Sequence, residues 1–586
     1  MRQWMVAAKK ADFYAIAEKF HVDPVVARII RNREVIGEKN IRIYLGGNLS
    51  DLSDPHQMKD MDRLVEILVQ KIRKQVRIRI IGDYDVDGVT SSHLFLTALR
   101  RVGAKVDVVI PHRIQDGYGL SLHLLQQAKE DGVDTILTCD NGIAAIDEIA
   151  WAKAQKMTVL VTDHHAVPFE EHEGRRTEKK SLADAVVNPH QQDCGYPYKE
   201  LCGAGVAWNV IRVLYENYDM DKREAEDLLD FVAMATVCDV MSLTGENRIL
   251  VKEGLKRIRH TKNTGLQALM QACNVQPENI SAYHFGYVLG PCVNATGRLD
   301  TARHALRLFE TGQETEAEEI ARDLVDLNQE RKELTLQGVE MAKKLCEEGG
   351  YENDPVLVLF LPDVHESIAG LIAGRIREMY NRPVFVLTRG EEGVKGSGRS
   401  TENYSMYENM CGCAELFTKF GGHPMAAGLS LPEENVEKFR RKINENCPLT
   451  VEEVCPDIHI DMAMPVGYAS TELVHQFALL EPFGKDNPSP LFADRNLSIS
   501  RMWVIGKNRN VLRMSVLSEY GQPVPVIFFG DVETLFAYFT EKFGQEEVEN
   551  ALHGRKNRIL FSMVYTAKVD FYQGNENLQL EMKYYR

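Results

Sequence analysis

The sequence lacks the features that would place a protein in a membrane or outside the cell. No apolar run approaches the roughly 20 residues of a membrane span. Residues 1–10 show neither a long apolar core nor a cleavage site, so we expect no secretory signal. The 11 cysteines have no paired framework, and the one close pair, Cys411 and Cys413, has no partner pair at zinc spacing. We therefore predict a cytoplasmic protein without membrane contact and interpret that pair as structural.

The chain has no excess of basic residues, since its formal net charge is −16 at pH 7. This value argues against a protein whose whole surface binds nucleic acid. It leaves room for a local basic groove, because electrostatic contacts act within about a Debye length, roughly 8–10 Å.

The 586 residues, of which 44% are hydrophobic and 26% charged, are typical of a globular protein with about three to four domains. Between residues 76 and 240, short apolar runs alternate with helical stretches, which predicts a parallel α/β sheet. The expected strands are 76–81, 106–110, 135–139, 158–161 and 185–187. A long amphipathic helix, a second α/β region and a β-rich tail that suits a small barrel are expected to follow.

The most informative motif places Asp83, Asp85 and Asp87 at alternate positions after the first predicted strand. Carboxylates this close repel one another, and they stay ionised together only when cations lie among them. Oxygen ligands favour Mg²⁺, Mn²⁺ or Ca²⁺. An acidic surface turn is one alternative. An EF-hand loop is another, but it needs a glutamate where this chain has Leu94 and a helix where we expect a strand.

Two further polar groups follow the next buried strands of the sheet. Asp140 follows the strand 135–139, and Asp163, His164 and His165 follow the strand 158–161. Because the carboxyl ends of parallel strands meet at one edge, we expect these side chains to converge with Asp85 and Asp87. Carboxylates and imidazoles without cysteine suit Mn²⁺ or Mg²⁺ in a hydrolase better than a structural zinc.

A carboxylate shared by two ions about 4 Å apart can activate a water and stabilise a leaving oxygen, which suits phosphoester or phosphoanhydride hydrolysis. In the second α/β region, Gly396, Ser397 and Gly398 let backbone N–H groups approach an anion, and Arg399 can bind it in bidentate fashion. Each part alone has an ordinary alternative, such as a surface pair of histidines or a turn with a solvated arginine.

Taken in order, these motifs resemble a known family. Asp83–Gly88, Asp140–Gly142, Asp163–His165 and Asp239 resemble the four motifs of the DHH phosphoesterase superfamily, and residues 396–400 and 421–428 resemble its DHHA1 domain. Residues 290–299, 366–370 and 481–488 resemble the RecJ branch, a family of single-strand-specific 5′ exonucleases. The resemblance covers nearly the whole chain.

The resemblance implies an α/β protein with two α/β domains joined by a long helix, a cleft between them, and a C-terminal OB-fold barrel. The expected domains are a helical region 1–60, a DHH catalytic domain 61–310, a connecting helix 311–349, a DHHA1 domain 350–455 and an OB-fold 456–586.

It also implies roles for individual residues, around two Mn²⁺ or Mg²⁺ ions. One ion would be bound by Asp87, Asp140, His164 and Asp239, and the other by Asp85 and Asp140 with Asp83 nearby. Asp140 and His165 would be catalytic, with His165 contacting the scissile phosphate or assisting the leaving group. The substrate would be bound by Asn294, Arg298, Arg375, Ser397, Arg399 and His423.

One position departs from the superfamily pattern. Many members carry a histidine four residues before the position that matches Asp85, and this chain has Ile81 there. The first metal would then be held more weakly, with help from Asp83 or water.

The implied activity is 5′→3′ hydrolysis of single-stranded DNA to 5′-mononucleotides in DNA repair and recombination. The protein would be a monomer, with a RecQ-type helicase and a single-strand-binding protein as partners. Aromatic and basic residues of the tail would stack on bases and follow the backbone, unless the aromatics are barrel core. These residues are Arg501, Trp503, Lys507, Arg509, Phe528, Phe529 and Tyr572.

Two other functions use the same fold. The first is a phosphodiesterase of short oligonucleotides or cyclic dinucleotides, against which the long C-terminal extension argues, because a dinucleotide needs no extended surface. The second is a non-catalytic scaffold, which rarely needs the complete set of acidic and histidine residues found here.

Overall fold

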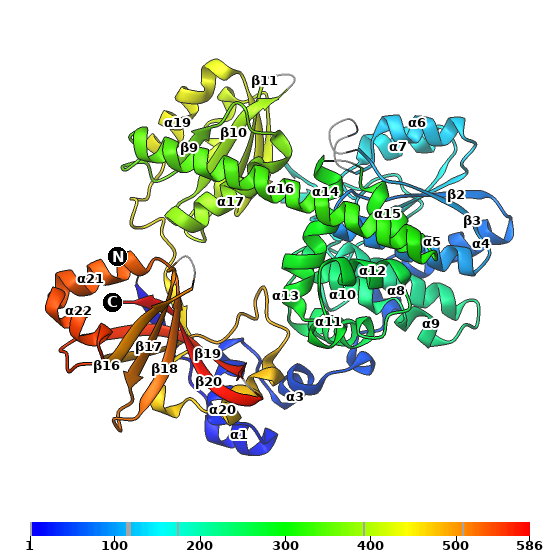
Figure 1. The fold of residues 1–586 in the computed structure, drawn as a ribbon. Coiled ribbons are helices and arrows are strands. Elements are labelled where there is room, and N and C mark those ends of the chain that lie inside the picture. The colour runs from blue at the N-terminus through cyan, green and yellow to red at the C-terminus, as the bar shows by residue number, and fades with distance from the viewer. Residues whose placement is uncertain are drawn as a thin grey trace. The chain divides into compact units, whose positions relative to one another are not determined.

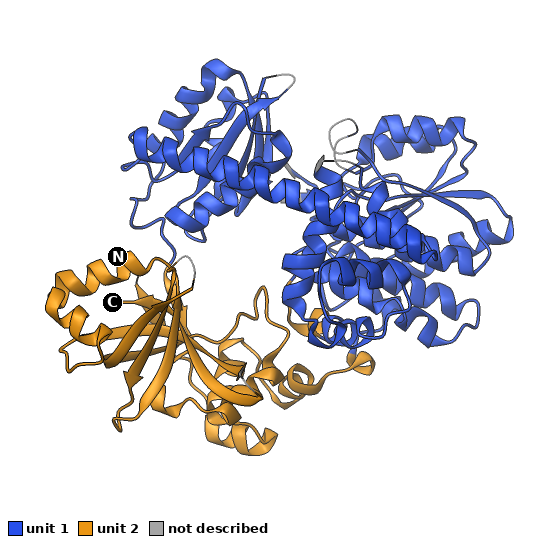
Figure 2. Cartoon of the chain, in the orientation of Figure 1, with its two compact units in different colours: residues 1–2, 52–241, 249–456 blue, residues 3–51, 242–248, 457–586 orange. Residues whose placement is uncertain are grey.

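The computed structural model describes residues 3–112, 116, 119–172, 175–299, 301–390, 393–506, 509–572 and 574–586. The chain forms two compact units (Figure 2). The first contains residues 52–241 and 249–456, and the second contains residues 3–51, 242–248 and 457–586. Across the described ranges, no helix has the length and apolar character needed to cross a membrane.

The first unit contains the predicted parallel sheet, which has the strand order β3-β2-β4-β5-β8. All four neighbouring pairs are parallel, and the central strands are buried. The chain passes from β2 to β3 on one side and then returns to β4 on the other, so the strand order reverses between β2 and β4. Ligands of such sheets bind at the carboxyl ends of the strands beside this switch point. The strands are β2 (Arg77–Ile81), β3 (Lys105–Val109), β4 (Thr135–Cys139), β5 (Thr158–Thr162) and β8 (Ala185–Val187).

Helices surround this sheet and continue the chain after it. The helix that follows β2, α5, is almost entirely buried because it packs on α8 and α10. A small hairpin pairs β6 (Phe169–His172) with β7 (Arg175–Glu178). The α-helices are α4 (Met61–Arg73), α5 (Val86–Arg101), α6 (Leu122–Glu130), α7 (Ile146–Ala154), α8 (Gly203–Glu216), α9 (Lys222–Glu226), α10 (Leu229–Cys238), α11 (Gly245–Ile258), α12 (Thr264–Ala272), α13 (Ala282–His284), α14 (Gly290–Leu299) and α15 (Arg303–Glu310).

The long helix α16 (Glu314–Glu348) connects the two α/β parts of the first unit, as predicted (Figure 1). Its first half packs on α12 and α14, where Ile320 and Leu324 are buried. Its second half shares a hydrophobic core with the next sheet through Val339 and Ala342. Apolar residues on one stripe of the helix therefore serve two cores in succession.

The second sheet of this unit is mixed, with the order β12-β13-β11-β10-β9. Only β9 and β10 are parallel, and the other pairs are antiparallel. The strands are β9 (Leu357–Phe360), β10 (Val384–Gly390), β11 (Gly393–Arg399), β12 (Lys419–His423) and β13 (Ala426–Leu431). The accompanying helices are α17 (Ala369–Tyr380), α18 (Met406–Cys411) and α19 (Val436–Glu445).

The second unit contains the predicted barrel. Its sheet order is β15-β16-β17-β18-β20-β19, and an additional pairing of β16 with β19 closes the ring. Short strands β1 (Trp4–Val6) and β14 (Ile458–Ile460) pair beside it. The barrel strands are β15 (Met462–Ala463), β16 (Phe492–Ile505), β17 (Val511–Leu517), β18 (Pro523–Phe529), β19 (Leu560–Tyr572) and β20 (Asn575–Tyr585). The C-terminal helices are α20 (Thr471–Phe477), α21 (Val532–Phe543) and α22 (Gln545–Leu552).

The N-terminal helices belong to the barrel's unit, which the sequence did not reveal. Helices α1 (Phe13–Phe20), α2 (Pro24–Asn32) and α3 (Glu38–Gly46) share one hydrophobic core with the barrel. A largely buried ion pair, with 2.9 Å between Arg33 Nη1 and Asp461 Oδ1, adds a polar link.

Candidate active site

The loops at the carboxyl ends of β2, β4 and β5 bring acidic and histidine side chains together at the switch point of the first sheet. In three groups of residues, one potential ligand atom of each member lies within 4.8 Å of the others. The groups are Asp83, Asp85 and Asp140; Asp87, His164 and Asp239; and Asp140, His164 and His165. Every residue that the sequence singled out as a metal ligand therefore lies in this cluster, and Asp239 joins it from the end of α10.

Two backbone N–H groups at the start of α8 hold Asp87. Gly203 N donates to Asp87 Oδ2 at 2.6 Å, and Ala204 N donates to Oδ1 at 2.7 Å. The amino end of a helix carries partial positive charge, so it favours the carboxylate and fixes its orientation. A Cβ on Gly203 would lie 2.7 Å from Asp140 Cβ, so this close approach requires glycine. The sequence reasoning missed Gly203, because a single glycine carries no signal of a close contact with Asp140.

The closeness of the other acidic residues carries an electrostatic cost. Burial, and then the charge of Asp85, raise the pKa of Asp83 well above its usual value. Burial and the charges of Asp87 and Asp85 do the same for the pKa of Asp140. Among the described residues, Asp83 Oδ1 has no hydrogen-bond partner although it is buried. Oxygen donors beside an imidazole fit Mn²⁺ or Mg²⁺, and cations would remove this repulsion.

The backbone at Asp140 is left-handed, with φ 61°, a conformation that aspartate and asparagine adopt more readily than most residues. The next residue, Asn141, donates through Nδ2 to Ile81 O at 3.0 Å and to Cys139 O at 2.9 Å, and so joins the ends of β2 and β4. The Ile81 side chain is buried in the hydrophobic core of the sheet. Where many superfamily members carry a histidine, this chain therefore has an isoleucine that packs in the core and supplies no metal ligand.

His165 is held by Asp163, which belongs to none of the three groups of potential metal ligands. Asp163 accepts hydrogen bonds from the backbone of Ile143, His164 and His165 and lies 2.8 Å from His165 Nδ1. Burial opposes protonation of His165, but the hydrogen bond to Asp163 and the negative charges of Asp163, Asp239 and Asp87 together outweigh burial and raise the pKa of His165 to about 9. The ring is partly exposed, with Nδ1 4.0 Å from Asp140 Oδ1. His165 can thus offer a positive charge to an anion at the cluster.

His164 is buried, and burial lowers its pKa. Its Nε2 lies 3.1 Å from Asp140 Oδ1, 3.7 Å from Asp87 Oδ2 and 3.6 Å from Asp239 Oδ2. A neutral imidazole is the form that binds metals, so this environment suits a ligand.

Two of the predicted phosphate-binding arginines meet the start of α17. Arg298 Nη1 donates to Ser367 O at 2.5 Å. A Cβ on Gly370 would lie 2.9 Å from Arg399 Nη2, so glycine makes room for that guanidinium. Residues 366–370 therefore lie beside both arginines.

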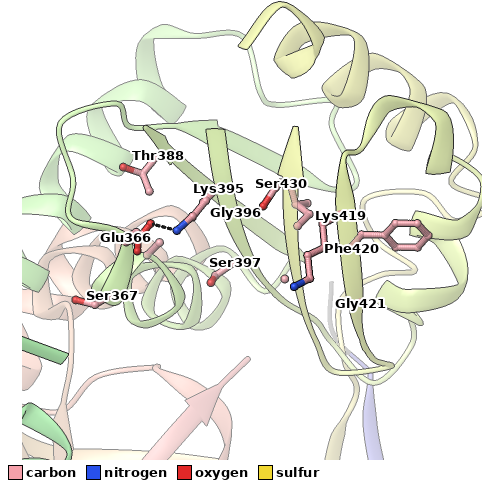
Figure 3. Close-up of a pocket in the computed structure, with 13 residues that line it drawn as sticks. Glu366, Ser367, Thr388, Lys395, Gly396, Ser397, Lys419, Phe420, Gly421 and Ser430 are labelled. Atoms are coloured by element: carbon pink, nitrogen blue, oxygen red, sulfur yellow. Dashed lines mark ion pairs between the residues drawn. The ribbon is translucent and has the colours of Figure 1, made fainter. Parts of the chain in front are cut away.

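Ser397 lines a pocket of about 420 Å³ on the second sheet (Figure 3). Ser367 lines it too, together with Lys395 and Lys419, which the sequence reasoning missed because a single lysine in a strand forms no pattern. Lys395 pairs with Glu366 at 2.8 Å. The pocket therefore combines hydroxyl groups and positive charge, which suits an anionic ligand.

The remaining predicted substrate residues have different surroundings. Asn294 Oδ1 accepts a hydrogen bond from Val86 N at 3.1 Å and so holds the start of α5. Arg375 is exposed on α17, 3.6 Å from Glu378 Oε2, and His423 is exposed at the end of β12. A substrate role for these three residues stays a prediction.

The barrel offers part of the aromatic and basic surface that the sequence suggested. Trp503 is 37% and Phe529 58% exposed, and the Arg501 guanidinium lies 5.7 Å from the Trp503 ring. Arg509 is exposed as well. Phe528 is buried in the barrel core, so the stacking role predicted for it is wrong. Lys507 and the side chain of Tyr572 lie outside the described residues.

Known families match most of the chain. The DHH family N-terminal domain matches residues 77–236, the DHHA1 domain residues 353–447 and the RecJ OB domain residues 460–584. "Single-stranded-DNA-specific exonuclease RecJ" of Haemophilus influenzae is 32% identical over 96% of each chain. The protein of the same name from Bacillus subtilis is 33% identical over 87% of this chain, which spans 63% of that relative's length.

A solved structure agrees with these matches. The match to the crystal structure of RecJ in complex with Mn²⁺ from Thermus thermophilus covers 100% of this chain and 79% of the Thermus chain. The TM-score is 0.81 and the sequence identity is 25%. The shared fold, the three domain matches and the full-length relative lead to one assignment. The chain belongs to the RecJ family.

Proposed function

We propose that this protein is a single-strand-specific DNA exonuclease that works from the 5′ end and releases 5′-mononucleotides. The observation that carries the proposal is the buried cluster of carboxylates and histidines at the switch point of the first sheet. The names of the relatives support DNA as the substrate and a single strand as its form. We place this activity in DNA repair and recombination.

In this proposal two Mn²⁺ or Mg²⁺ ions are held by the cluster, and the Thermus RecJ structure, which is a complex with Mn²⁺, supports that choice. Asp87, His164 and Asp239 would hold one ion, Asp83 and Asp85 the other, and Asp140 both. When bound, such ions supply a hydroxide nucleophile and stabilise charge on the leaving oxygen.

The residues of the chain orient the reactants. The start of α8 holds the Asp87 carboxylate in position through two hydrogen bonds, and Asp163 holds the His165 ring beside the cluster. The His165 cation would contact the scissile phosphate and place a proton near the leaving oxygen. Arg298 and Arg399, beside the start of α17, would bind the phosphates of the strand.

The substrate role of Arg399 can be tested by alanine substitution. We expect Arg399→Ala to weaken binding of single-stranded DNA about 10-fold, which is about 1.4 kcal/mol, because one bidentate phosphate contact is lost. The slope of log affinity against log salt should fall by about 0.7. Fluorescence anisotropy with a labelled 30-mer measures both. Arg389→Ala is the control, since Arg389 is an exposed arginine of β10 that pairs with Glu433 at 2.9 Å. Equal losses in the two variants would contradict the assignment.

The barrel surface calls for point variants, because truncation at residue 456 would expose the apolar faces of α1–α3 as well. We expect Trp503→Ala to weaken binding of single-stranded DNA roughly 10-fold, since a base stacked on an aromatic ring contributes about 1–3 kcal/mol. Cleavage of a dinucleotide should be unchanged. Tyr520→Ala, at an 80% exposed residue of the same unit, is the control. If Trp503→Ala binds DNA like the wild type, this surface does not contact the strand.

One experiment tests the function as a whole. The protein is incubated with Mn²⁺ and a long single-stranded DNA labelled at either end, beside the corresponding blunt duplex. Early release of the 5′ label as a mononucleotide, with the duplex intact, is the expected result. Equal rates on dinucleotides and long strands would instead favour the small-substrate phosphodiesterase, and absence of cleavage with intact metal binding would favour a scaffold.

The proposal includes the setting of the enzyme. We place it in the cytoplasm as a monomer that receives single strands from a RecQ-type helicase and a single-strand-binding protein. We also propose that the domains of the chain end at residues 60, 310, 349 and 455. Co-purification of the tagged chain tests the partners.

A further inference from the structure

Two thiols lie close together beside the proposed active site. Cys273 Sγ and Cys292 Sγ are 3.8 Å apart. Cys273 follows the last residue of α12 and is partly exposed, whereas Cys292 lies in the first turn of α14 and is 2% exposed. Both helices pack on α16. A disulfide needs the sulfurs about 2 Å apart, so closure requires them to approach by a little less than 2 Å.

We propose that Cys273 and Cys292 are an oxidisable dithiol, which peroxide converts into a disulfide that lowers the nuclease activity. The proposal goes beyond the function proposed above, and its chemistry can be measured without any nuclease assay. It concerns none of the residues of the metal cluster.

The surroundings give the two thiols different parts in the reaction. Contact with the Cys292 sulfur lowers the pKa of Cys273, and the positive charge of Lys332 acts in the same direction. For Cys292, the neighbouring Cys273 and then burial raise the pKa. Cys273 is thus the more exposed and the more acidic of the two thiols. An oxidant attacks first the sulfur that has these two properties.

The reaction has two balanced steps. The Cys273 thiolate attacks hydrogen peroxide, forms an S–O bond and releases hydroxide, which leaves a sulfenic acid. The Cys292 thiol then attacks the Cys273 sulfur, forms the S–S bond and expels the hydroxyl group, which leaves with the thiol proton as water. Two thiols are oxidised by two electrons, and one peroxide is reduced to two molecules of water in all.

Disulfide formation would disturb the segment that supports the active site. In the reduced state the Cys292 thiol donates to Val288 O at 3.2 Å and accepts from Asn328 Nδ2 at 3.3 Å. Movement of Cys292 toward Cys273 weakens both contacts and pulls on α14. Two residues later, Asn294 holds Val86 N at the start of α5, and α5 begins within the acidic motif. The oxidised enzyme should therefore orient Asp85 and Asp87 less well.

The test uses the full chain, first reduced and then treated with hydrogen peroxide at a few equivalents. Remaining thiols are alkylated, and the protein is digested and mapped by mass spectrometry without reduction. We expect a peptide that links Cys273 to Cys292 with a loss of two hydrogens, formed in the monomer and reversed by dithiothreitol. The Cys273→Ser variant should not form it, and Cys411→Ser, which removes an exposed cysteine, should form it normally.

The activity assay tests the consequence. We expect the oxidised wild type to cleave single-stranded DNA at least about threefold more slowly than the reduced form, whereas Cys273→Ser should keep its rate after peroxide. Alkylation of both cysteines after peroxide treatment, or an intermolecular link through Cys411 alone, would overturn the dithiol. A cross-linked wild type with full activity would overturn its effect on the enzyme. If no form of the protein cleaves DNA, the proposed function fails while the thiol map still decides the dithiol.

Discussion

Replacing Asp140 with asparagine is expected to reduce kcat for hydrolysis of single-stranded DNA by at least about 1,000-fold, or about 4 kcal/mol. Asp140 belongs to two of the three groups of potential metal ligands, so its loss affects both proposed ions. Asparagine keeps the shape of the side chain and tolerates the local φ of 61°, where alanine would add strain. A variant with near wild-type activity would exclude the two-metal mechanism.

The same variant should be more stable than the wild type when metal is removed. Burial and the neighbouring charges raise the pKa of Asp140, so ionisation of this group costs stability at pH 7. That loss of stability is present above about pH 4, the pKa of an aspartate in the unfolded chain. It disappears below that pH, because Asp140 is then protonated in both the folded and the unfolded states. Thermal melts in EDTA should therefore favour Asp140→Asn at pH 7 and show a smaller difference near pH 4. With Mn²⁺ the order at pH 7 should reverse.

The control is Asp193→Asn, which removes an exposed carboxylate of the same unit that pairs with Lys59 at 2.7 Å. It should leave both activity and metal dependence unchanged. An Asp140→Asn variant that is less stable than the wild type in EDTA would mean that the carboxylate has a favourable partner in the metal-free protein, contrary to the repulsion argued above.

Most of the metal cluster could be predicted from sequence because it depends on a local rule, whereas Asp239, at the end of α10, was expected only from the family resemblance. Short polar segments follow the apolar strands, and parallel strands bring their carboxyl ends to one edge. Asp85, Asp140 and His164 each lie within four residues of the end of such a strand, so their convergence needs no long-range information. The same rule does not say how each side chain is oriented, and Asp163 illustrates this, since it supports His165 instead of facing the other carboxylates.

Contacts between distant parts of the chain could not be predicted. Residues 481–488 were recognisable as a family segment, but the structure shows a supporting role: Asn487 is buried and lies 2.8 Å from Tyr44 OH. Arg248 donates to the carbonyl groups of Tyr44 and Leu480, each within 2.8 Å. These residues are hundreds of positions apart, and their polar side chains carry no periodic pattern that would reveal their burial. The packing of α1–α3 on the barrel was missed for the same reason.

Substitution of Gly203, the glycine at the start of α8, is expected to have the second large effect, after Asp140→Asn. In Gly203→Ala the new methyl group would lie 2.7 Å from Asp140 Cβ and 2.8 Å from Asp140 Oδ1. Either Asp140 or the start of α8 must move, and movement of the helix lengthens the hydrogen bonds to Asp87, which are 2.6 and 2.7 Å long. We expect at least a 100-fold loss of kcat/KM and a weaker apparent affinity for Mn²⁺, because the ligands are misplaced even though all are present.

Gly205→Ala provides a matched control within the same helix turn. A Cβ there would meet Leu201 at 3.4 Å, which is an ordinary contact, and alanine stabilises a helix relative to glycine. This variant should keep the activity and Mn²⁺ affinity of the wild type and gain up to about 1 kcal/mol of stability. Mn²⁺ titrations of DNA cleavage, with circular dichroism to confirm folding, compare the two. If Gly203→Ala folds and cleaves DNA like Gly205→Ala, the contact of α8 with Asp87 and Asp140 does not position the catalytic carboxylates.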